Sequence, residues 1–305
     1  MTASGGSAIG RPGDPSAVRS LALDEVEATY VVDGVLQMQP VVFFPAISRD
    51  YWSARPELFT AAGTMPMSAG GLLIERGDTT LLIDAGVGTA TVDFPGADVD
   101  CGAMIDVLET IGRRPEDIDV VAFTHLHFDH AGWAYANSAK TFPHARYVIA
   151  AREWARFADC THPCRDKTTP WHVVWQLASD SDSIDLIDDG EEIVPGVRAV
   201  VTQGHTPGHT SYVITSSSGR RLVALGDAFH TPAHLAHPEW LSAADPDAAG
   251  VESARRRLLA ELTEPDTLGF GFHFGDQCFG RVIPGHGGET AWEPVPTSVL
   301  APSPR

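Results

Sequence analysis

The sequence predicts an α/β protein, because strand-like and helix-like segments alternate along it and several strands are followed directly by histidine or aspartate. Two apolar runs, residues 71–76 and 79–84, flank Gly77-Asp78 and predict a β-hairpin. The uninterrupted apolar run 119–124 predicts a buried strand. Ligand sites in α/β proteins tend to lie at the carboxyl ends of strands, so the polar residues there are the first candidates for a site.

The remaining elements follow from the same patterns of apolar residues. Helices are expected over 103–111, 151–158 and 247–262, and further strands over 145–149, 197–202, 211–215 and 221–227. The first 18 residues are rich in Gly, Ser and Pro and predict a disordered tail. We expect one domain over residues 19–295, with a cover segment around residues 41–52 near its start, and a C-terminal tail over 296–305.

Composition narrows the class of protein. The 305 residues are 43% hydrophobic and 20% charged, as in ordinary globular proteins, and the formal net charge is −19. Such an acidic surface disfavours both nucleic acid and anionic membranes as partners. No segment is long and apolar enough to span a membrane, the start lacks the pattern of a secretory signal, and four cysteines are too few for a disulfide scaffold. A cytoplasmic location is the resulting expectation.

The segment Thr124-His125-Leu126-His127-Phe128-Asp129-His130 carries the strongest chemical signal. It follows the strand expected at 119–124, and alternation along an extended chain places His125 and His127 on the same side. Asp129 and His130 come around the following turn. Imidazole nitrogens and carboxylate oxygens are ligands that zinc accepts, so the segment predicts a metal site.

H-x-H-x-D-H after a strand resembles the signature of the metallo-β-lactamase superfamily. Other segments match in the same order: residues 80–86 resemble its early strand and Asp-x-Gly turn, residues 204–210 its second histidine segment, and residues 225–227 its bridging-aspartate strand. The similarity covers about residues 65–295. It implies a four-layer αβ/βα sandwich, with two sheets packed together, helices outside, and the site at one edge.

The resemblance also implies a ligand set for two divalent metal ions, expected to be Zn²⁺. His125, His127 and His205 would hold one ion, Asp129, His130 and a later histidine would hold the other, and Asp227 would bridge both. Asp129 and Asp227 are therefore the expected catalytic residues. His209 is expected to support the site rather than bind metal, and Asp84 to orient a ligand histidine.

Two residues compete for the last ligand position. Pro284-Gly285-His286-Gly287 offers His286, as in many members of the superfamily. His273 is followed by Phe274, Phe279-Gly280, Val282 and then Trp292, which is similar to a branch of lactonases and organophosphate hydrolases. We favour His273, although residues 275–278 replace the prolines usual in that branch.

The implied activity is hydrolysis by a hydroxide that bridges the two metal ions, with a lactone or another carboxylic ester as substrate. A phosphotriesterase or β-lactamase-type hydrolase is the alternative within the same chemistry, and a mononuclear iron sulfur dioxygenase is the alternative from another class. Phe128 and Phe229 are expected near the substrate, and His230 and His234 either support the site or face solvent. The branch also implies a homodimer.

Overall fold

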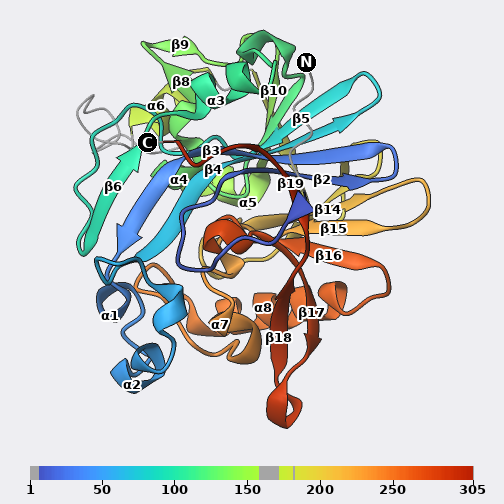
Figure 1. Cartoon of the computed structure of the whole chain (residues 1–305). Coiled ribbons are helices and arrows are strands. Elements are labelled where there is room, and N and C mark those ends of the chain that lie inside the picture. Colours follow the sequence, from blue (N-terminus) through green and yellow to red (C-terminus); the bar gives the residue numbers. More distant parts are fainter. Residues whose placement is uncertain (1–6, 158–171, 181–182, 305) are drawn as a thin grey trace.

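The computed structural model describes residues 7–157, 172–180 and 183–304. In these ranges the larger sheet has the strand order β1-β19-β2-β3-β4-β5-β7-β10-β11, with β6 paired to β3 (Figure 1). Its strands are β1 (Ser7–Ala8), β2 (Val18–Leu23), β3 (Val26–Met38), β4 (Met65–Arg76), β5 (Thr79–Ile83), β6 (Ala97–Cys101), β7 (Val120–Ala122), β10 (Arg146–Ala150), β11 (Ile184–Ile187) and β19 (Thr297–Ala301). Strands β5, β7, β10 and β11 run parallel, so their carboxyl ends meet at one edge.

The second sheet has the order β12-β13-β14-β15-β16-β17-β18, and β8 pairs with β9 in a separate hairpin. Their bounds are β8 (Tyr135–Ala136), β9 (Ala139–Lys140), β12 (Glu192–Val194), β13 (Val197–Val201), β14 (Thr210–Thr215), β15 (Arg221–Ala224), β16 (Thr267–Phe270), β17 (Phe279–Pro284) and β18 (Thr290–Pro294). Strands β15 and β16 run parallel, whereas the other neighbours in this sheet are antiparallel.

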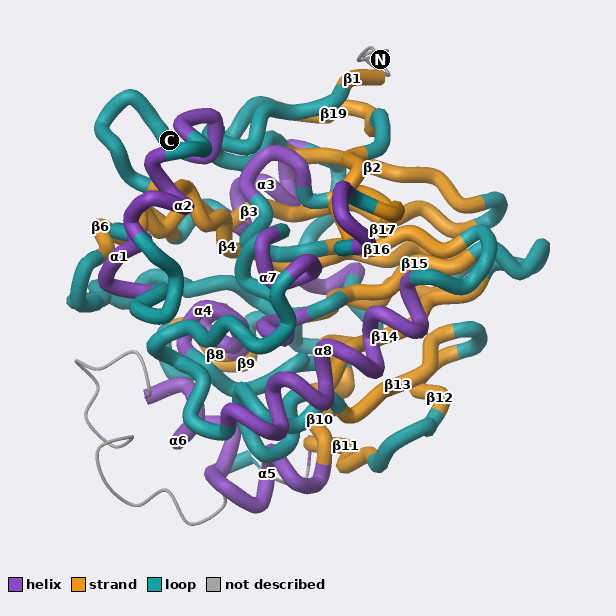
Figure 2. The backbone as a smooth tube through the Cα atoms, turned by 90° about the horizontal axis from the view of Figure 1, so that it is seen from below, coloured by secondary structure: helices purple, strands orange, loops and turns teal. Residues whose placement is uncertain are grey.

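The helices lie on the outer faces of the two sheets and over one edge (Figure 2). They are α1 (Pro40–Phe43), α2 (Arg49–Ser53), α3 (Met104–Thr110), α4 (Phe128–Ala131), α5 (Ala151–Phe157), α6 (His172–Ser179), α7 (Ala233–Ala236) and α8 (Ala248–Leu262). The Asp247 side chain accepts the Gly250 N–H and so caps the start of α8, whose Leu258 and Leu262 pack on the second sheet. Helices α3 and α6 pack on the outer face of the larger sheet.

The main hydrophobic core lies between the two sheets. Apolar side chains of the larger sheet, such as Tyr30, Leu72 and Val148, meet Tyr212 and Phe270 of the second sheet in one buried cluster. The layers are therefore helix, sheet, sheet, helix, and the four-layer αβ/βα sandwich expected from the sequence is confirmed. The hairpin at 71–84 and the helices and strands expected after it also occur, with ends shifted by a few residues at most.

Both chain ends differ from the expected tails where the structure describes them. Residues 1–6 lie outside the described residues, but Ser7–Ala8 pairs with β19, and Ser16 is buried. Thr297–Ala301 pairs with β2 as well, so it belongs to the larger sheet. Within the described part of this segment, Pro12 and Gly13 lie in a turn, and strand pairing lies on both sides of it. Two of the four cysteines that the sequence contains, Cys160 and Cys164, lie outside the described residues.

No helix in the described part of the chain is long and apolar enough to cross a membrane.

Candidate metal centre

The side chains singled out in the sequence come from loops at the ends of neighbouring strands. His125 and His127 follow β7, and Asp129 and His130 lie in the first turn of α4. His205 lies between β13 and β14, Asp227 in the turn after β15, and His273 between β16 and β17. The two sheets thus deliver these residues to one edge of the sandwich.

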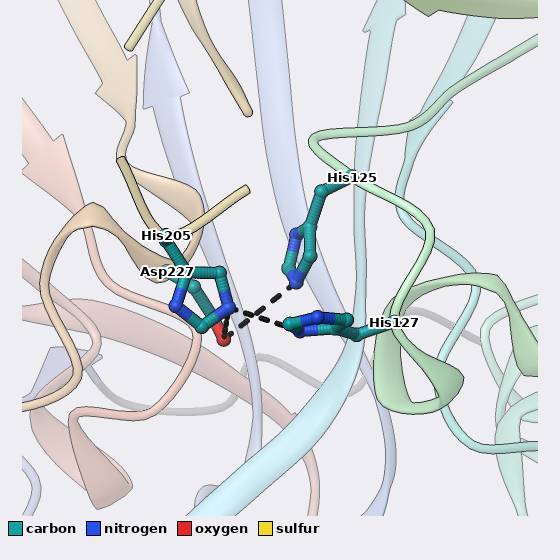
Figure 3. Close-up of side chains that lie close together, drawn as sticks. All are labelled: His125, His127, His205 and Asp227. Atoms are coloured by element: carbon teal, nitrogen blue, oxygen red, sulfur yellow. Dashed lines mark hydrogen bonds and ion pairs between the residues drawn. The ribbon is translucent and has the colours of Figure 1, made fainter. Parts of the chain in front are cut away.

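A first group of donors consists of His125, His127, His205 and Asp227, whose ligand atoms all lie within 4.8 Å of one another. Figure 3 shows the three imidazole rings converging on the Asp227 carboxylate. Asp227 Oδ2 lies 3.8 Å from His125 Nε2 and 3.2 Å from His205 Nε2. His205 Nε2 is also 3.0 Å from His127 Nδ1.

A second group consists of Asp129, His130, His273 and again Asp227. Here the other carboxylate oxygen, Asp227 Oδ1, lies 3.0 Å from the Nε2 atoms of both His130 and His273. Asp129 Oδ2 lies 3.8 Å from each of these nitrogens. Asp227 therefore turns one oxygen toward each group, as a residue shared by two metal ions would.

The fit to metal ions rests on buried polar atoms without hydrogen bonds. Among the described residues, Nε2 of His125, His130 and His273 and Oδ1 of Asp227 have no hydrogen-bond partner. Nε2 of His130 and of His273 approaches the Asp227 carboxylate to 3.0 Å but is not aligned to donate a hydrogen bond to it. Burying such atoms unpaired is costly, and a cation in each of the two donor groups would satisfy them.

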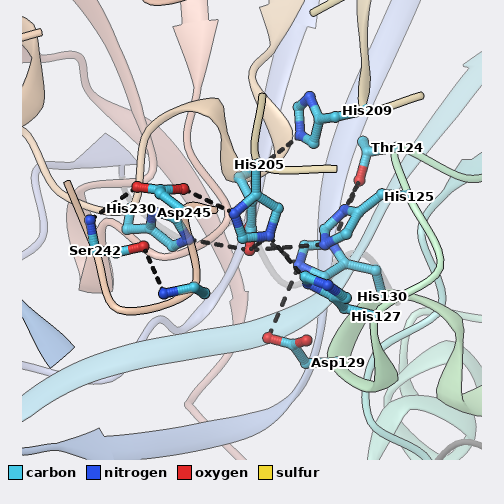
Figure 4. Close-up of polar contacts among 12 residues, drawn as sticks. Thr124, His125, His127, Asp129, His130, His205, His209, His230, Ser242 and Asp245 are labelled. Carbon is cyan, nitrogen blue, oxygen red and sulfur yellow. Dashed lines mark hydrogen bonds and ion pairs between the residues drawn. The ribbon is translucent and has the colours of Figure 1, made fainter. Parts of the chain in front are cut away.

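Hydrogen bonds on the side of each ring that faces away from the centre fix the ligand histidines, and Figure 4 shows the one between His205 and Asp245. His130 Nδ1 lies 2.8 Å from Asp84 Oδ2, His205 Nδ1 lies 2.9 Å from Asp245 Oδ1, and His273 Nδ1 lies 2.9 Å from the Ser68 carbonyl oxygen. Each acceptor leaves Nε2 directed toward the centre. The role expected for Asp84 agrees with this contact, whereas Asp245 was not foreseen, because it lies in an irregular loop 40 residues from its partner.

His209 supports the shared aspartate instead of joining either group. Its Nε2 accepts the Asp227 N–H at 2.9 Å, and its Nδ1 donates to Thr202 Oγ1 at 2.8 Å. Gly226, beside it, has a φ of +57°, and a Cβ there would lie 2.5 Å from His209 Nε2. Glycine is therefore needed for the turn that presents Asp227.

Electrostatics divide the histidines into two kinds. Burial, together with neighbouring histidines, lowers the pKa of His125 and His127 well below the ordinary value and keeps these rings neutral. Burial also acts against charge on His205, but Asp227 and Asp245 outweigh it and raise the pKa of His205 to about 9. Without bound cations the centre therefore holds protons that metal ions would displace.

A cavity of about 270 Å³ opens above the centre. Its wall is largely apolar, and its floor includes ligand candidates from both groups: Leu36, Met38, Phe43, Met67, Phe94, His127, Phe128, Asp129, His205, Asp227, His230, Ala243, Ala244 and His273. Phe43 comes from α1, in the segment expected to cover the site. Phe128 lies here as expected, but Phe229 does not, because it packs beneath α8 with Leu258.

Of the two candidates for the last ligand, the structure describes the side chain of His273 alone. His273 belongs to the second donor group. Residue 286 lies in the turn between β17 and β18, at the far end of that hairpin (Figure 1). The side chain of His286 is outside the described part of the structure, so the case for His273 rests on its own contacts.

With this geometry in place, comparison with known proteins gives the family. The model of the metallo-beta-lactamase superfamily matches residues 72–271. The chain belongs to this superfamily. An N-acyl homoserine lactonase from Bacillus thuringiensis is 26% identical over 228 residues, which are 70% of this chain and 84% of the relative.

Solved structures agree in fold. One is AidC, a dizinc quorum-quenching lactonase in complex with a product. Its alignment with this chain covers 92% of this chain and 98% of AidC, with 22% sequence identity and a TM-score of 0.79. Another is a probable metal-dependent hydrolase from Staphylococcus aureus. That alignment covers 90% of this chain and 99% of the hydrolase, with 25% sequence identity and a TM-score of 0.71. Family and donor groups together identify the chain as a metal-dependent hydrolase of the metallo-β-lactamase superfamily.

Proposed function

We propose that this chain opens the ring of N-acyl homoserine lactones with the help of two zinc ions. The observation that carries the proposal is Asp227, which faces two separate donor groups at the floor of an apolar cavity. Curated relatives that align with 70% of the chain are N-acyl homoserine lactonases. A single iron ion, as in a mononuclear sulfur dioxygenase, would occupy only one of the two donor groups and would not account for the other.

The donor set suits zinc, which accepts imidazole nitrogen and carboxylate oxygen. His125, His127 and His205 would hold one ion, Asp129, His130 and His273 the other, and Asp227 both. When bound, two such ions supply hydroxide at neutral pH and polarise a carbonyl oxygen. The residues of this chain hold the ions, orient the substrate and move the proton.

The cavity wall supports a neutral, hydrophobic acyl chain. Leu36, Met38, Met67 and Phe94 contribute to it, and no Lys or Arg is among its described lining residues. A volume of about 270 Å³ lies below the roughly 300–1,000 Å³ of pockets for drug-sized ligands. Short and medium acyl chains should therefore fit better than long ones.

Asp129 is the residue best placed to handle the proton. Its carboxylate lies at the cavity wall, 3.8 Å from Nε2 of both His130 and His273. As hydroxide adds to the carbonyl carbon, Asp129 would accept its proton and then deliver it to the ring oxygen when the ring C–O bond breaks. The product is the open hydroxy acid.

The test is ring opening by the zinc-loaded chain, followed through the release of protons. The panel holds N-acyl homoserine lactones of increasing chain length, a simple lactone, an aryl ester and a phosphotriester. We expect turnover of the acylated lactones, abolished by a chelator and by Asp227→Asn. Zinc-loaded protein that leaves every lactone intact while cleaving the aryl ester or the phosphotriester would overturn the proposal.

Homodimer formation and a cytoplasmic location stay predictions from the sequence. Sedimentation of the zinc-loaded chain tests the first, because a dimer has twice the mass of the chain. Fractionation of cells that express the full chain tests the second.

A further inference from the structure

Glu153 is a buried carboxylate next to the metal centre that belongs to neither of the two donor groups built on Asp227. It lies in the first turn of α5, directly after β10, and only 1% of its surface is exposed. A carboxylate is rarely buried so completely unless its oxygens are engaged. Here both oxygens accept backbone N–H groups: Oε1 accepts from Leu126 and Oε2 from Gly208, each at 3.1 Å.

These two N–H groups belong to the two loops that supply the histidines of the first donor group. Leu126 stands between the two ligand histidines that follow β7, in the larger sheet. Gly208 lies three residues after His205, in the loop between β13 and β14 of the second sheet. Glu153 therefore links the two loops across the boundary between the sheets, with one oxygen for each loop.

The fit between α5 and the second of these loops is close. A Cβ at Gly208 would lie 2.0 Å from the Glu153 nitrogen and 2.5 Å from its Cα, so the contact leaves no room for a side chain at residue 208. The loops also meet directly, because the Thr210 N–H donates to the Thr124 carbonyl oxygen at 2.8 Å. They are thus tied at two points, by one backbone hydrogen bond and by the Glu153 carboxylate.

The second donor group is held by other contacts. Asp84 and the Ser68 carbonyl oxygen orient His130 and His273, whereas both hydrogen bonds of Glu153 end on the loops of the first group. Metal–ligand distances are set to within about 0.2 Å. A shift of one loop against the other therefore disturbs the first group more than the second.

We propose that Glu153 is a positioning residue that sets the zinc affinity of the first donor group by holding its two histidine loops at a fixed separation. The inference rests on the proposed function for its ligand set, because it takes the three histidines of that group as ligands. The carboxylate acts through the backbone of both loops and transfers no proton. A glutamine at this position keeps one oxygen acceptor but turns an NH₂ group toward the other N–H, which releases one loop.

The experiment measures zinc affinity at each donor group separately. His273→Ala leaves the first group intact and His127→Ala leaves the second, so each of these backgrounds retains one complete group. Glu153→Gln is introduced into both backgrounds, and each metal-free protein is titrated with zinc against a chelating dye. Glu109→Gln is the matched control, because Glu109 is an exposed glutamate on α3. Circular dichroism checks that every variant is folded.

We expect Glu153→Gln to lower the zinc affinity of the first group about 30-fold and that of the second less than about threefold, since residues that support a metal ligand typically contribute about 10–100-fold. Glu109→Gln should change neither affinity. Glu153→Asp keeps the charge and both oxygens on a side chain one methylene shorter. It should show a smaller loss with the same preference for the first group, and it replaces Glu153→Gln in the test if that variant does not fold.

Equal losses at both groups would overturn the proposal, because Glu153 would then serve only the fold. Unchanged affinity at the first group would overturn it as well. Lactone turnover by the zinc-loaded wild type decides the proposed function separately. A wild type without turnover would overturn that function, whereas a selective loss at the first group would still support the role of Glu153 in holding the metal.

Discussion

Arg19 and Asp276 form a buried ion pair that ties the start of the chain to the turn after His273. The Arg19 Nη2 and Asp276 Oδ2 atoms are 2.5 Å apart, Nε donates to Oδ1 at 2.6 Å, and the two side chains are 5% and 12% exposed. The Ala17 N–H donates to the same carboxylate at 2.8 Å. Asp276 lies in the stretch 275–278 that departs from the prolines of the lactonase branch, so in this chain a charge pair secures the turn.

The same N-terminal segment also reaches the other side of His273. The Ser16 N–H donates to Ser68 Oγ at 2.8 Å, and the Ser68 carbonyl oxygen lies 2.9 Å from His273 Nδ1. Residues 14–19 thus brace both the turn after His273 and the group that orients its ring. The second donor group depends on this bracing.

Asp276→Asn should therefore weaken metal binding at the second group more than at the first. Removing a residue that supports a metal ligand typically lowers the affinity for the metal by about 10–100-fold, and we expect a loss of about tenfold at the second group. Titration of metal-free protein with zinc against a chelating dye measures the two affinities. Glu293→Gln is the control, because Glu293 pairs with Arg281 on the surface, where both side chains are about half exposed. An equal loss at both groups would mean that the pair serves only the fold.

Asp129→Ala tests the residue assigned to both metal binding and proton transfer. We expect fewer than two zinc ions per chain, together with a loss in kcat of about 100-fold or more, since general acid–base catalysis alone contributes about 10²–10⁴-fold. Metal analysis and lactone turnover provide the measurements. Asp98→Ala removes an exposed carboxylate on β6 and should behave as wild type. Full metal content with wild-type rates in Asp129→Ala would contradict the assignment.

The ligand candidates that directly follow strands could be predicted from the sequence. The residues that hold them in place, which are distant in the sequence, could not. His125, His127, His205 and Asp227 follow strands whose apolar pattern is visible in the sequence, so their convergence at one edge follows from the fold. Asp245 has no such signal, because only the folding of its loop brings it to His205. The Arg19–Asp276 pair spans 257 positions, and no sequence pattern links the two residues.

The chain ends show the same limit. Composition predicted tails, but the pairing of Ser7–Ala8 and Thr297–Ala301 depends on a free edge at β2, which the local sequence does not reveal. Phe229 was expected at the substrate because it is near Asp227 in the chain. The turn at residues 226–228 directs it beneath α8 instead.

Arg255→Met should destabilise the protein through Asp245. The Arg255 guanidinium is fully buried, lies 3.3 Å from Asp245 Oδ2, and donates to the carbonyl oxygens of Ala228 and Trp240. Removing one partner of a buried pair leaves an uncompensated charge, which costs about 3–5 kcal/mol. Urea unfolding of the metal-free protein measures the change. The control is Arg256→Met, at the next residue of α8, which breaks an exposed ion pair with Glu252. It should lower the free energy of unfolding by at most about 1 kcal/mol. Equal losses of stability in the two variants would contradict the argument.

His209 should make the metal-free protein less stable in acid. Burial, with His205 nearby, lowers the pKa of His209 from 6.5 to about 3, and the neutral ring accepts the Asp227 N–H. Between these values the unfolded chain binds a proton that the folded chain does not, so the free energy of unfolding falls as the pH falls. One such group contributes a slope of about 1.4 kcal/mol per pH unit. His209→Gln keeps an acceptor but does not titrate, so urea unfolding across this range should show the slope reduced by about that amount. An unchanged slope in His209→Gln would mean that other groups account for the acid sensitivity.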